Sequence, residues 1–252
     1  MATYLNVVLI AAAFVAGLVD AIAGGGGLVT LPALLAAGLP PHVALGTNKG
    51  QAVFGATTSA LSFWRRGMVD RARAPLGFAA GFAGSCLGVL GVLAVPLRPL
   101  RVIVIVLLLI AAAVVLARRN VEPRAHSMGP AASAAALAGI ALVLGAYDGF
   151  FGPGTGSMLV VAFAVVFGDT LTRASGNAKI VNLASNVAAM LLFAHRGVVI
   201  WSIALPMAAA NALGAFTGAH LAVRKGDRLV RAVVLLVVAA IAVKLAVDLA
   251  RG

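Results

Sequence analysis

Long apolar segments recur along the whole chain, and the short stretches between them hold most of the charged residues. A helix needs about 20 mainly apolar residues to cross a hydrocarbon core of about 30 Å. The first segment has no Lys or Arg before it and no cleavage site followed by a soluble domain, so we interpret it as a retained helix. The pattern predicts eight full spans, at residues 4–22, 43–64, 74–95, 99–117, 131–149, 173–194, 199–222 and 229–250.

Two shorter apolar pieces, residues 27–38 and 157–168, each lie at a glycine-rich stretch. At 1.5 Å per residue, a helix of about 12 residues rises only about 18 Å, which is too short to cross the bilayer. We therefore expect an all-α polytopic membrane protein with about eight full helices and two short half-helices that start at glycine.

Composition supports a membrane protein. Hydrophobic residues make up 62% of the chain and charged residues 10%, whereas soluble domains are about 45–50% apolar and about 25% charged. The net charge of +12 comes from basic residues between the spans, which is typical of positive-inside loops and indicates a lipid bilayer, not nucleic acid, as the partner. A single cysteine, Cys86, excludes a disulfide framework within the chain and a cysteine metal site.

The chain contains an internal repeat. A shift of 128 residues places Asp20 on Asp148 and Gly24 on Gly152. Charged residues are scarce, so paired Lys, Asp and Arg-Gly matches are not easily chance. We divide the single membrane domain into a first repeat, 1–122, and a second, 123–252. A shift of 130 aligns Gly46 with Gly176, Lys49 with Lys179, Arg66-Gly67 with Arg196-Gly197, Gly84 with Gly214, Gly88 with Gly218, Arg98 with Arg228 and Arg101 with Arg231.

The distribution of basic residues favours repeats that face opposite ways. If each half-helix counts as a crossing, every repeat has an odd number of segments, so the second copy is upside down. This scheme leaves only Arg98, Arg101, Arg196 and Arg251 outside, and both termini on the outer side. An even scheme loses much of the bias. The basic residues placed inside are Arg65, Arg66, Arg71, Arg73, Arg118, Arg119, Arg124, Arg173, Arg224, Lys225, Arg228 and Arg231.

The two glycine-rich stretches resemble anion sites. One runs from Asp20 to four consecutive glycines, and the other from Asp148 to Ser157. Glycine allows a backbone with positive φ, and the free N–H groups at the start of a helix attract anions. Broken helices in repeated transporters use this device at the midplane. The alternative is that these glycines serve only close helix packing. The predicted anion-binding residues here are Gly25, Gly26, Gly27, Gly154, Thr155, Gly156 and Ser157.

Two lysines lie inside apolar spans at the same place in each repeat. A buried intramembrane lysine costs at least about 2.5–3.5 kcal/mol unless it is paired or faces water, so Lys49 and Lys179 imply a negative partner. Asn182 and Asn186 share the face of Lys179, whereas the first copy has Ala52 and Ala56 there, which makes the lining asymmetric. We add Thr47, Asn48, Lys49, Asn177, Lys179 and Asn182 to the predicted binding residues.

The partner of the lysines is open at this stage. Asp20 and Asp148 pair with them in a structural lock, or the lysines attract substrate while one aspartate carries a coupling proton. Thr47, Ser157 and Ser175 are hydroxyl donors to an oxyanion or to their own backbone.

Other residues carry less chemistry. Trp64 and Trp201 fall at span ends, as interfacial anchors do. The four histidines lack a metal-ligand spacing, the glycine loop lacks the Gly-Lys-Ser/Thr ending of a phosphate loop, and no G-x-S-x-G elbow occurs. We expect no catalytic residue, metal or cofactor, and therefore not an enzyme.

The motifs together resemble the TauE/SafE sulfite exporter family over nearly the full length. The most specific is the stretch Gly149 to Ser157; Gly24 to Gly27, Gly46 to Asn48 and Gly176 to Lys179 accompany it. The resemblance implies a small, multi-pass permease of the bacterial inner membrane, built from repeated halves, that moves sulfite, sulfonates or related organic anions. The first glycine loop lacks the Pro and Thr of the second, which puts equal contributions from the halves in doubt.

The sequence therefore predicts a secondary transporter for a small sulfur-containing anion such as sulfite or an organosulfonate, with alternating access around a midplane site and proton coupling through Asp20 or Asp148. An uncoupled anion channel is the alternative. An intramembrane enzyme and a passive scaffold are disfavoured, by the missing catalytic motifs and by the repeated intramembrane charges respectively. Substrate identity, direction and oligomeric state are beyond the sequence.

Overall fold

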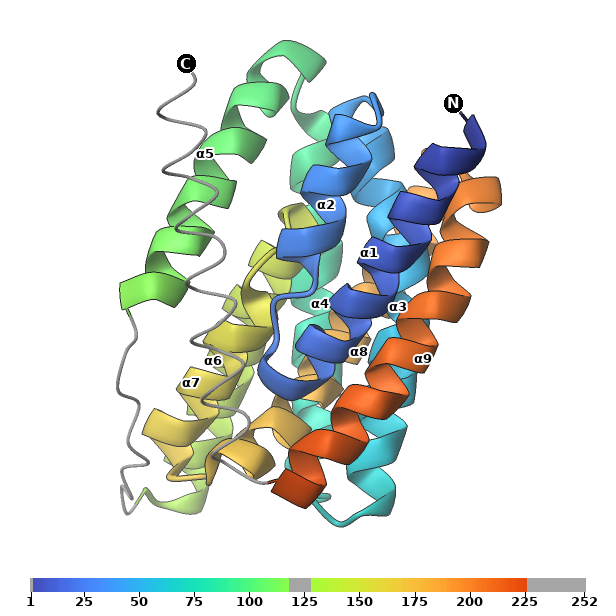
Figure 1. Cartoon of the computed structure of the whole chain (residues 1–252). Coiled ribbons are helices and arrows are strands. Elements are labelled where there is room, and N and C mark those ends of the chain that lie inside the picture. Colours follow the sequence, from blue (N-terminus) through green and yellow to red (C-terminus); the bar gives the residue numbers. More distant parts are fainter. Residues whose placement is uncertain (1, 118–127, 226–252) are drawn as a thin grey trace.

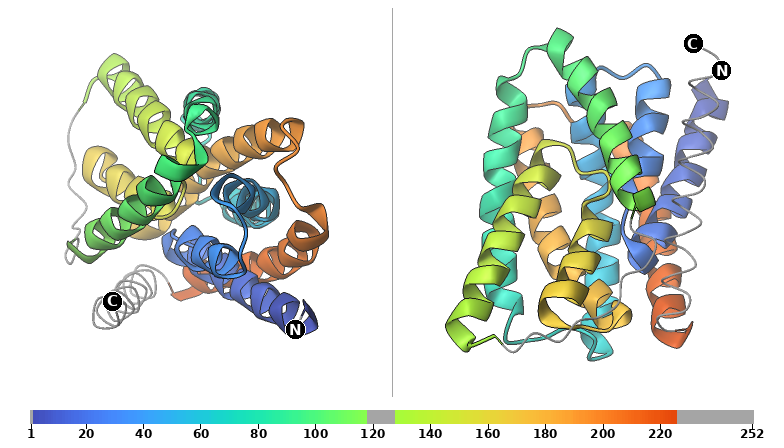
Figure 2. Two further views of the ribbon diagram at one scale, coloured as in Figure 1. Left: turned by 90° about the horizontal axis from the view of Figure 1, so that it is seen from above. Right: turned by 90° about the vertical axis from the view of Figure 1, so that its left-hand side faces the viewer.

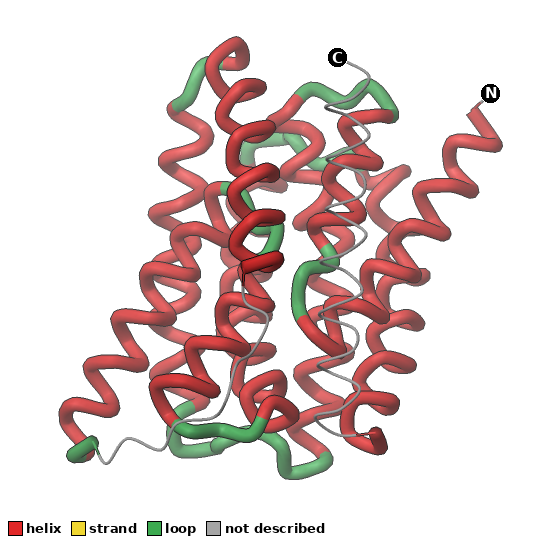
Figure 3. The backbone as a smooth tube through the Cα atoms, turned by 60° about the vertical axis from the view of Figure 1, so that its left-hand side comes forward, coloured by secondary structure: helices red, strands yellow, loops and turns green. Residues whose placement is uncertain are grey.

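The computed structural model describes residues 2–117 and 128–225, and every regular element in that part of the chain is a helix (Figures 1 and 3). This confirms the all-α prediction for the described residues. The helices are α1 Ala2–Ala23, α2 Gly27–Ala36, α3 Pro41–Arg65, α4 Ala74–Ala94, α5 Leu97–Ala117, α6 Pro130–Phe150, α7 Thr155–Phe167, α8 Leu171–His195 and α9 Trp201–Lys225.

Each predicted span within the described residues corresponds to one long helix, and the predicted span at 229–250 lies outside them. The count of eight spans therefore stays a prediction. By length and composition, the helices able to cross a membrane are found at Asn6–Ala23, Ala74–Ala94, Pro130–Phe150, Leu171–His195 and Trp201–Arg224. Their outer faces expose large apolar side chains such as Leu87, Val143 and Phe216. Lipid would cover such faces.

The two predicted half-helices are α2 and α7, each of which follows a glycine turn. The turn before α2 holds Gly24 and Gly25 at φ +72° and +111°, and the turn before α7 holds Gly152 and Gly154 at φ +101° and +86°. Backbone in this region suits glycine because other residues place a Cβ against the chain. The glycines therefore reverse the chain direction inside the bundle.

The two half-helices start near each other and run in opposite directions. α2 returns toward the end of the bundle where α1 begins, whereas α7 runs toward the opposite end, where α6 begins (Figures 1 and 2). The turns touch: Gly27 lies against Pro153, and a Cβ on Gly24 would overlap the backbone of Gly156. Two helix N-termini thus meet inside the molecule.

Helices of each half pack on helices of the other half, and the pairs correspond under the repeat. α1 packs along α9 as α6 packs along α4, α3 packs on α9 as α8 packs on α4, and α3 and α8 pack on each other. Single contacts repeat in the same way: Gly84 faces the carbonyl of Leu142 and Gly214 that of Phe14. The first helix of each half, α1 or α6, therefore packs on a helix of the other half, and the halves are interlocked.

The loops that follow α3 and α8 also make corresponding contacts with the other half. Gly46 packs against the carbonyl of Val198, and Gly176 packs against that of Met68. Residues 46 and 176, like 68 and 198, are 130 apart. The turns themselves match, since Gly67 and Gly197 have φ +70° and +67°. The same shift of 130 residues thus relates contacts at the two ends of the bundle.

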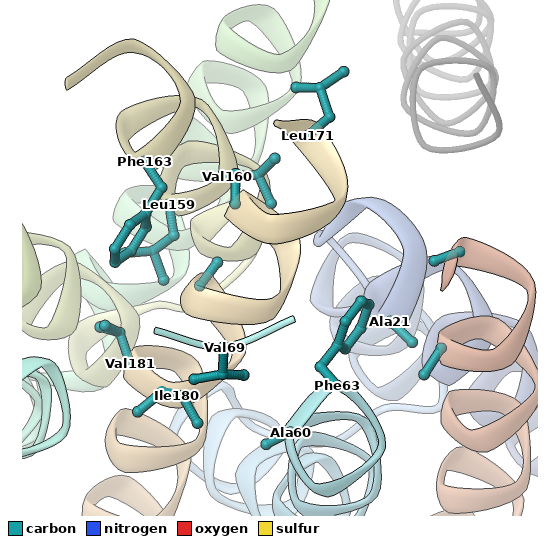
Figure 4. Packing of buried hydrophobic residues seen from close by; sticks show 14 of the residues in the cluster. Ala21, Ala60, Phe63, Val69, Leu159, Val160, Phe163, Leu171, Ile180 and Val181 are labelled. Carbon is teal, nitrogen blue, oxygen red and sulfur yellow. The ribbon is translucent and has the colours of Figure 1, made fainter. Parts of the chain in front are cut away.

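Buried apolar side chains form two clusters. One includes Phe63, Val69 and Phe163 and lies toward the loop at residues 66–73 (Figure 4). The other includes Phe193 and Val199, the repeat counterparts of Phe63 and Val69, and lies toward the opposite end. The meeting point of the half-helices lies between them, with packed apolar residues toward either end of the bundle.

Candidate functional site

Two buried ion pairs join the halves. Nζ of Lys49 lies 2.9 Å from Oδ1 of Asp148, and both side chains are 3% exposed. Nζ of Lys179 lies 2.7 Å from Oδ2 of Asp20, with the side chains 1% and 23% exposed. Each lysine of one repeat therefore meets the aspartate of the other. Neutralisation by a buried carboxylate removes the large cost of an isolated intramembrane charge.

Asp20 closes the N-terminus of α2. Its Oδ1 accepts hydrogen bonds from the backbone N–H groups of Gly25 at 3.1 Å and Gly26 at 3.3 Å. Lys179 donates to the Asp20 carboxylate and also to its backbone carbonyl. A carboxylate at a helix N-terminus satisfies free N–H groups and the positive end of the dipole. One side chain thus links α1, α2 and α8.

Asp148 is held by side chains of α8. Besides Lys49, the hydroxyl of Ser185 donates to its Oδ2, and Nδ2 of Asn186 lies 3.5 Å from the same oxygen. The corresponding residues of the first repeat are Gly55 and Ala56, which have no side-chain donor. The two aspartates therefore occupy equivalent places but have different partners.

The turn before α7 is tied to the rest of the site. The hydroxyl of Ser157 lies 2.9 Å from the carbonyl of Ala23 and 2.8 Å from that of Gly24. Thr155 donates through Oγ1 to the carbonyl of Gly152 at 2.7 Å, and the hydroxyl of Tyr147 donates to the carbonyl of Pro153 at 2.9 Å. The Ser157 bonds hold the two glycine turns against each other, and the other two bonds brace the turn before α7.

A polar cavity of about 40 Å³ lies between the turns and the ion pairs. This is room for about three waters, well below the roughly 300–1,000 Å³ of pockets for larger ligands. The cavity therefore suits a small polar species. It is lined by Asp20, Gly25, Gly26, Gly27, Asn48, Lys49, Gln51, Ala52, Asp148, Gly152, Gly156, Asn182, Asn186 and Asn211.

Side-chain amides form one wall of the cavity. Oδ1 of Asn48 accepts from Thr30 at 2.6 Å and from Nε2 of Gln51 at 3.1 Å. Oε1 of Gln51 is buried and has no hydrogen-bond partner among the described residues. From α9, Asn211 donates to the carbonyl of Ala13 at 3.1 Å. A buried acceptor without a donor is costly, so this wall has an unused hydrogen-bonding position.

Comparison with known proteins identifies the family of the chain. The family described as Sulfite exporter TauE/SafE matches residues 9–245. The chain belongs to the TauE/SafE family. No solved structure matches it.

Several curated proteins are similar over nearly their whole length, and all are named as probable membrane transporters. The chain is 36% identical to the ORF9 protein of Sinorhizobium sp. over 98% of this chain and 95% of that one. It is 38% identical to YfcA of Escherichia coli K12, over 96% and 89%, and 37% identical to a Haemophilus influenzae protein, over 91% and 89%. The TauE/SafE chain is thus a multi-pass membrane protein of transporter type.

The residues predicted for the TauE/SafE site fall into three groups. Those on the cavity wall are Gly25, Gly26, Gly27, Asn48, Lys49, Gly156 and Asn182, together with Asp20 and Asp148. Those next to the wall, in the turns or ion pairs, are Gly154, Thr155, Ser157 and Lys179. Those away from it are Thr47, which accepts from the backbone N–H of Ile200 at 3.1 Å, and Asn177, which accepts from that of Asp70 at 2.7 Å.

The prediction missed Gln51, Asn211 and Gly152, and noted Asn186 only as part of a polar face. Gln51 lies two residues after Lys49, and Asn211 is the one side-chain amide in α9. Polar residues isolated within apolar spans are the signal that would have found both. Neither has a polar counterpart in the other repeat, where Val181 and Gly81 stand, so the repeat comparison passed over them.

A second polar cluster lies near the loop at residues 66–73. Arg73 lies 3.2 Å from Asp70 and 3.5 Å from Asp169, and its guanidinium lies 4.6 Å from the ring centre of Phe167. Asn177 donates to Asp169 at 2.7 Å. Burial raises the pKa of the Asp169 carboxyl above its ordinary value, against the opposing effects of Asn177 and Arg73. This cluster joins the turn before α8 to the loop before α4.

Proposed function

We propose that this TauE/SafE protein is a proton-coupled secondary transporter for a small sulfur-containing anion, such as sulfite or an organosulfonate, in the bacterial inner membrane. The carrying observation is the polar cavity, where two buried Lys–Asp pairs surround the meeting point of two half-helix N-termini. Lysines and helix N-termini are the groups that attract an oxyanion in a dehydrated site. We assign the protein no enzymatic activity.

We further propose that the halves are inverted repeats and that the full protein has eight spans plus two half-helices. Support comes from the opposite directions of α2 and α7 and from the exchanged contacts of α1 with α9 and α6 with α4. In this arrangement the loop at residues 66–73 faces the cytoplasm, in line with its basic residues.

Alternating access follows from the two apolar clusters. In this mechanism each cluster is the gate between the cavity and one end of the bundle. Opening the cluster that contains Phe63 would expose the cavity to one side, and opening the cluster that contains Phe193 would expose it to the other. The interlocked halves provide two related packings for this exchange, as a repeated scaffold does in rocking transporters.

The test is flux in liposomes that contain the purified full chain. A pH gradient imposed across the membrane should drive sulfite or an organosulfonate against its own gradient, and a protonophore should abolish this accumulation. Flux that only follows the anion gradient would replace the transporter with an uncoupled channel. Absence of flux for sulfite, taurine, sulfoacetate and thiosulfate would reject the proposed substrate class. Thr58→Val is a matched control, because Thr58 is half-buried, lies outside the cavity wall, and its hydroxyl bonds to its own helix, at the carbonyl of Phe54.

A further inference from the structure

We propose that Asp20 is a tethered competitor for the transported anion, and that its displacement and protonation couple anion binding to one proton. In this mechanism the incoming anion takes the position of the Asp20 carboxylate at the N-terminus of α2. The inference rests on the proposed transport function and assigns the coupling role to Asp20 rather than Asp148.

The donors that an oxyanion needs are already in use. The N–H groups of Gly25 and Gly26 and the ammonium of Lys179 all donate to the Asp20 carboxylate. A carboxylate and an oxyanion such as a sulfonate carry the same kind of acceptor oxygens, so one group of donors serves either ligand. Because these groups cannot donate fully to both, anion binding at this helix end requires Asp20 to leave.

Asp20 is the aspartate that is free to leave. Its side chain is 23% exposed and lines the cavity, whereas the side chain of Asp148 is 3% exposed. Asp148 is also held by Ser185 and Asn186, for which the first repeat has only Gly55 and Ala56. Displacement of Asp148 would leave the buried ammonium of Lys49 without its partner, whereas an anion at the N-terminus of α2 would take over the donors of Asp20, so Asp148 stays in place.

The cavity offers a partner for the arriving group. Gln51 is 1% exposed, lines the cavity, and has an Oε1 with no hydrogen-bond partner among the described residues. Once protonated, the Asp20 carboxyl carries an O–H donor that the carboxylate lacks. A displaced, protonated Asp20 or a water beside the anion would satisfy this acceptor. Gln51 is therefore a candidate partner for the displaced, protonated carboxyl of Asp20.

Charge balance requires the proton. In the empty site Asp20 neutralises Lys179, and Lys49 and Asp148 neutralise each other on the opposite wall. A bound monoanion with Asp20 still ionised would leave one uncompensated negative charge in a buried cavity, which is strongly unfavourable. Transfer of one proton from water to the Asp20 carboxylate restores neutrality: the anion then pairs with Lys179, and the carboxyl is uncharged.

The test counts protons on binding. Methanesulfonate is a suitable probe, because its charge does not change near neutral pH. Titration calorimetry of the full chain in two buffers of different ionisation enthalpy gives the protons taken up per anion bound. We expect one for the wild type, and none for Asp20→Asn, whose affinity should no longer weaken with rising pH. For the wild type the affinity should fall about tenfold for each pH unit over the range in which one proton is taken up on binding. Thr58→Val, whose residue lies outside the cavity wall, should keep the proton uptake.

Several results would overturn the inference. These are anion binding by the wild type without proton uptake, proton uptake that persists in Asp20→Asn, loss of uptake in Thr58→Val as well as in Asp20→Asn, and no binding of the probe. If Asp20→Asn does not fold, the wild-type proton count and its pH dependence still decide. Sulfite flux in liposomes separates the two proposals: flux with no proton uptake retains the transporter and rejects the role of Asp20, whereas binding with uptake but no flux retains that role and rejects transport.

Discussion

At the scale of single residues, the site depends on charges that are buried in pairs. Lys49 and Lys179 each reach a carboxylate on the other repeat, so the pairs stabilise the association of the halves as well as neutralising the lysines. A buried ion pair contributes little net stability, but loss of one partner leaves an unpaired charge. The structural lock and the substrate site considered from the sequence are therefore compatible, because one pair can lock while the other opens.

Substitution of one partner should destabilise the fold more than substitution of both. Lys49→Met leaves Asp148 charged and buried, so we expect the free energy of unfolding to fall by about 3–5 kcal/mol. The double variant Lys49→Met/Asp148→Leu should recover most of this loss. Denaturant unfolding in detergent measures both. Equal stability of the single variant and the wild type would contradict a buried pair, and a double variant no more stable than the single would show that the packing, not the charge, fails.

The sequence was informative about site residues that recur in both repeats. Glycine turns, lysines and aspartates stand out because they are matched and because charges are rare in spans. Gln51 and Asn211 have no such match, so the repeat comparison passed over them, although each is an isolated polar residue in an apolar span that the fold places on the cavity wall. Thr47 and Asn177 neighbour the site in sequence, but helix geometry directs them to loop backbones at opposite ends of the bundle.

At the scale of helices, hydrophobic length located the elements well, because a span must satisfy its backbone internally over a fixed thickness. The packing partners could not be predicted in the same way. α1 packs on α9, and α4 on α6, through glycines that let the backbones approach closely. Many other glycines in the sequence have no such role, and which of them lie in an interface depends on the tertiary fold.

A methyl group on an interface glycine should therefore be harmful, and equally so in both repeats. Gly214→Ala and Gly84→Ala each place a Cβ against a carbonyl of the neighbouring helix. We expect each to lower stability by about 1–3 kcal/mol, as overpacking does. Gly139→Ala is the control, since nothing lies within 4 Å of a Cβ there; it should be neutral or slightly stabilising. Thermal unfolding of the three variants compares them, and a control as damaging as the interface variants would contradict this account.

The turn between α7 and α8 should make stability depend on pH. Because the pKa of Asp169 is raised, the folded state binds its proton more tightly than the unfolded chain does. The free energy of unfolding should then decrease as pH rises from the ordinary value of 3.8 through the raised folded pKa, and become level above it. Asp169→Asn, which keeps an oxygen acceptor for Asn177, should flatten this slope. Unfolding curves across the acidic range measure it; parallel slopes in the two proteins would contradict burial as the dominant cause.

At the scale of the whole molecule, the scaffold is close to symmetric and the cavity it surrounds is not. Contacts such as Gly46 with Val198 and Gly176 with Met68 recur between the halves. By contrast, the two aspartates differ in their partners. In the mechanism that we propose, the near-symmetric scaffold supplies two related gates, and the asymmetric site allows one ion pair to open while the other holds the halves together.

Inversion of the repeats gives a direct prediction for labelling. Arg65 and His195 are exposed, occupy equivalent positions 130 residues apart, and end α3 and α8 at opposite ends of the bundle. In a Cys86→Ala background, cysteines at these two positions should react with a membrane-impermeant thiol reagent from opposite sides. Arg224→Cys provides the control, because α9 brings it to the end where Arg66 contacts His220.

The three labelling results separate the possible topologies. Reaction of Arg65→Cys and Arg224→Cys from the cytoplasmic side, with His195→Cys reacting only from outside, is the expected outcome. Reaction of Arg65→Cys and His195→Cys from the same side would mean parallel repeats. The corresponding contacts between the halves would then not lie on opposite sides of the membrane. If Arg224→Cys instead reacted opposite to Arg65→Cys, the path of α9 itself would be wrong. In either case the two apolar clusters would no longer lie toward opposite faces of the membrane, and alternating access between them would have no structural basis.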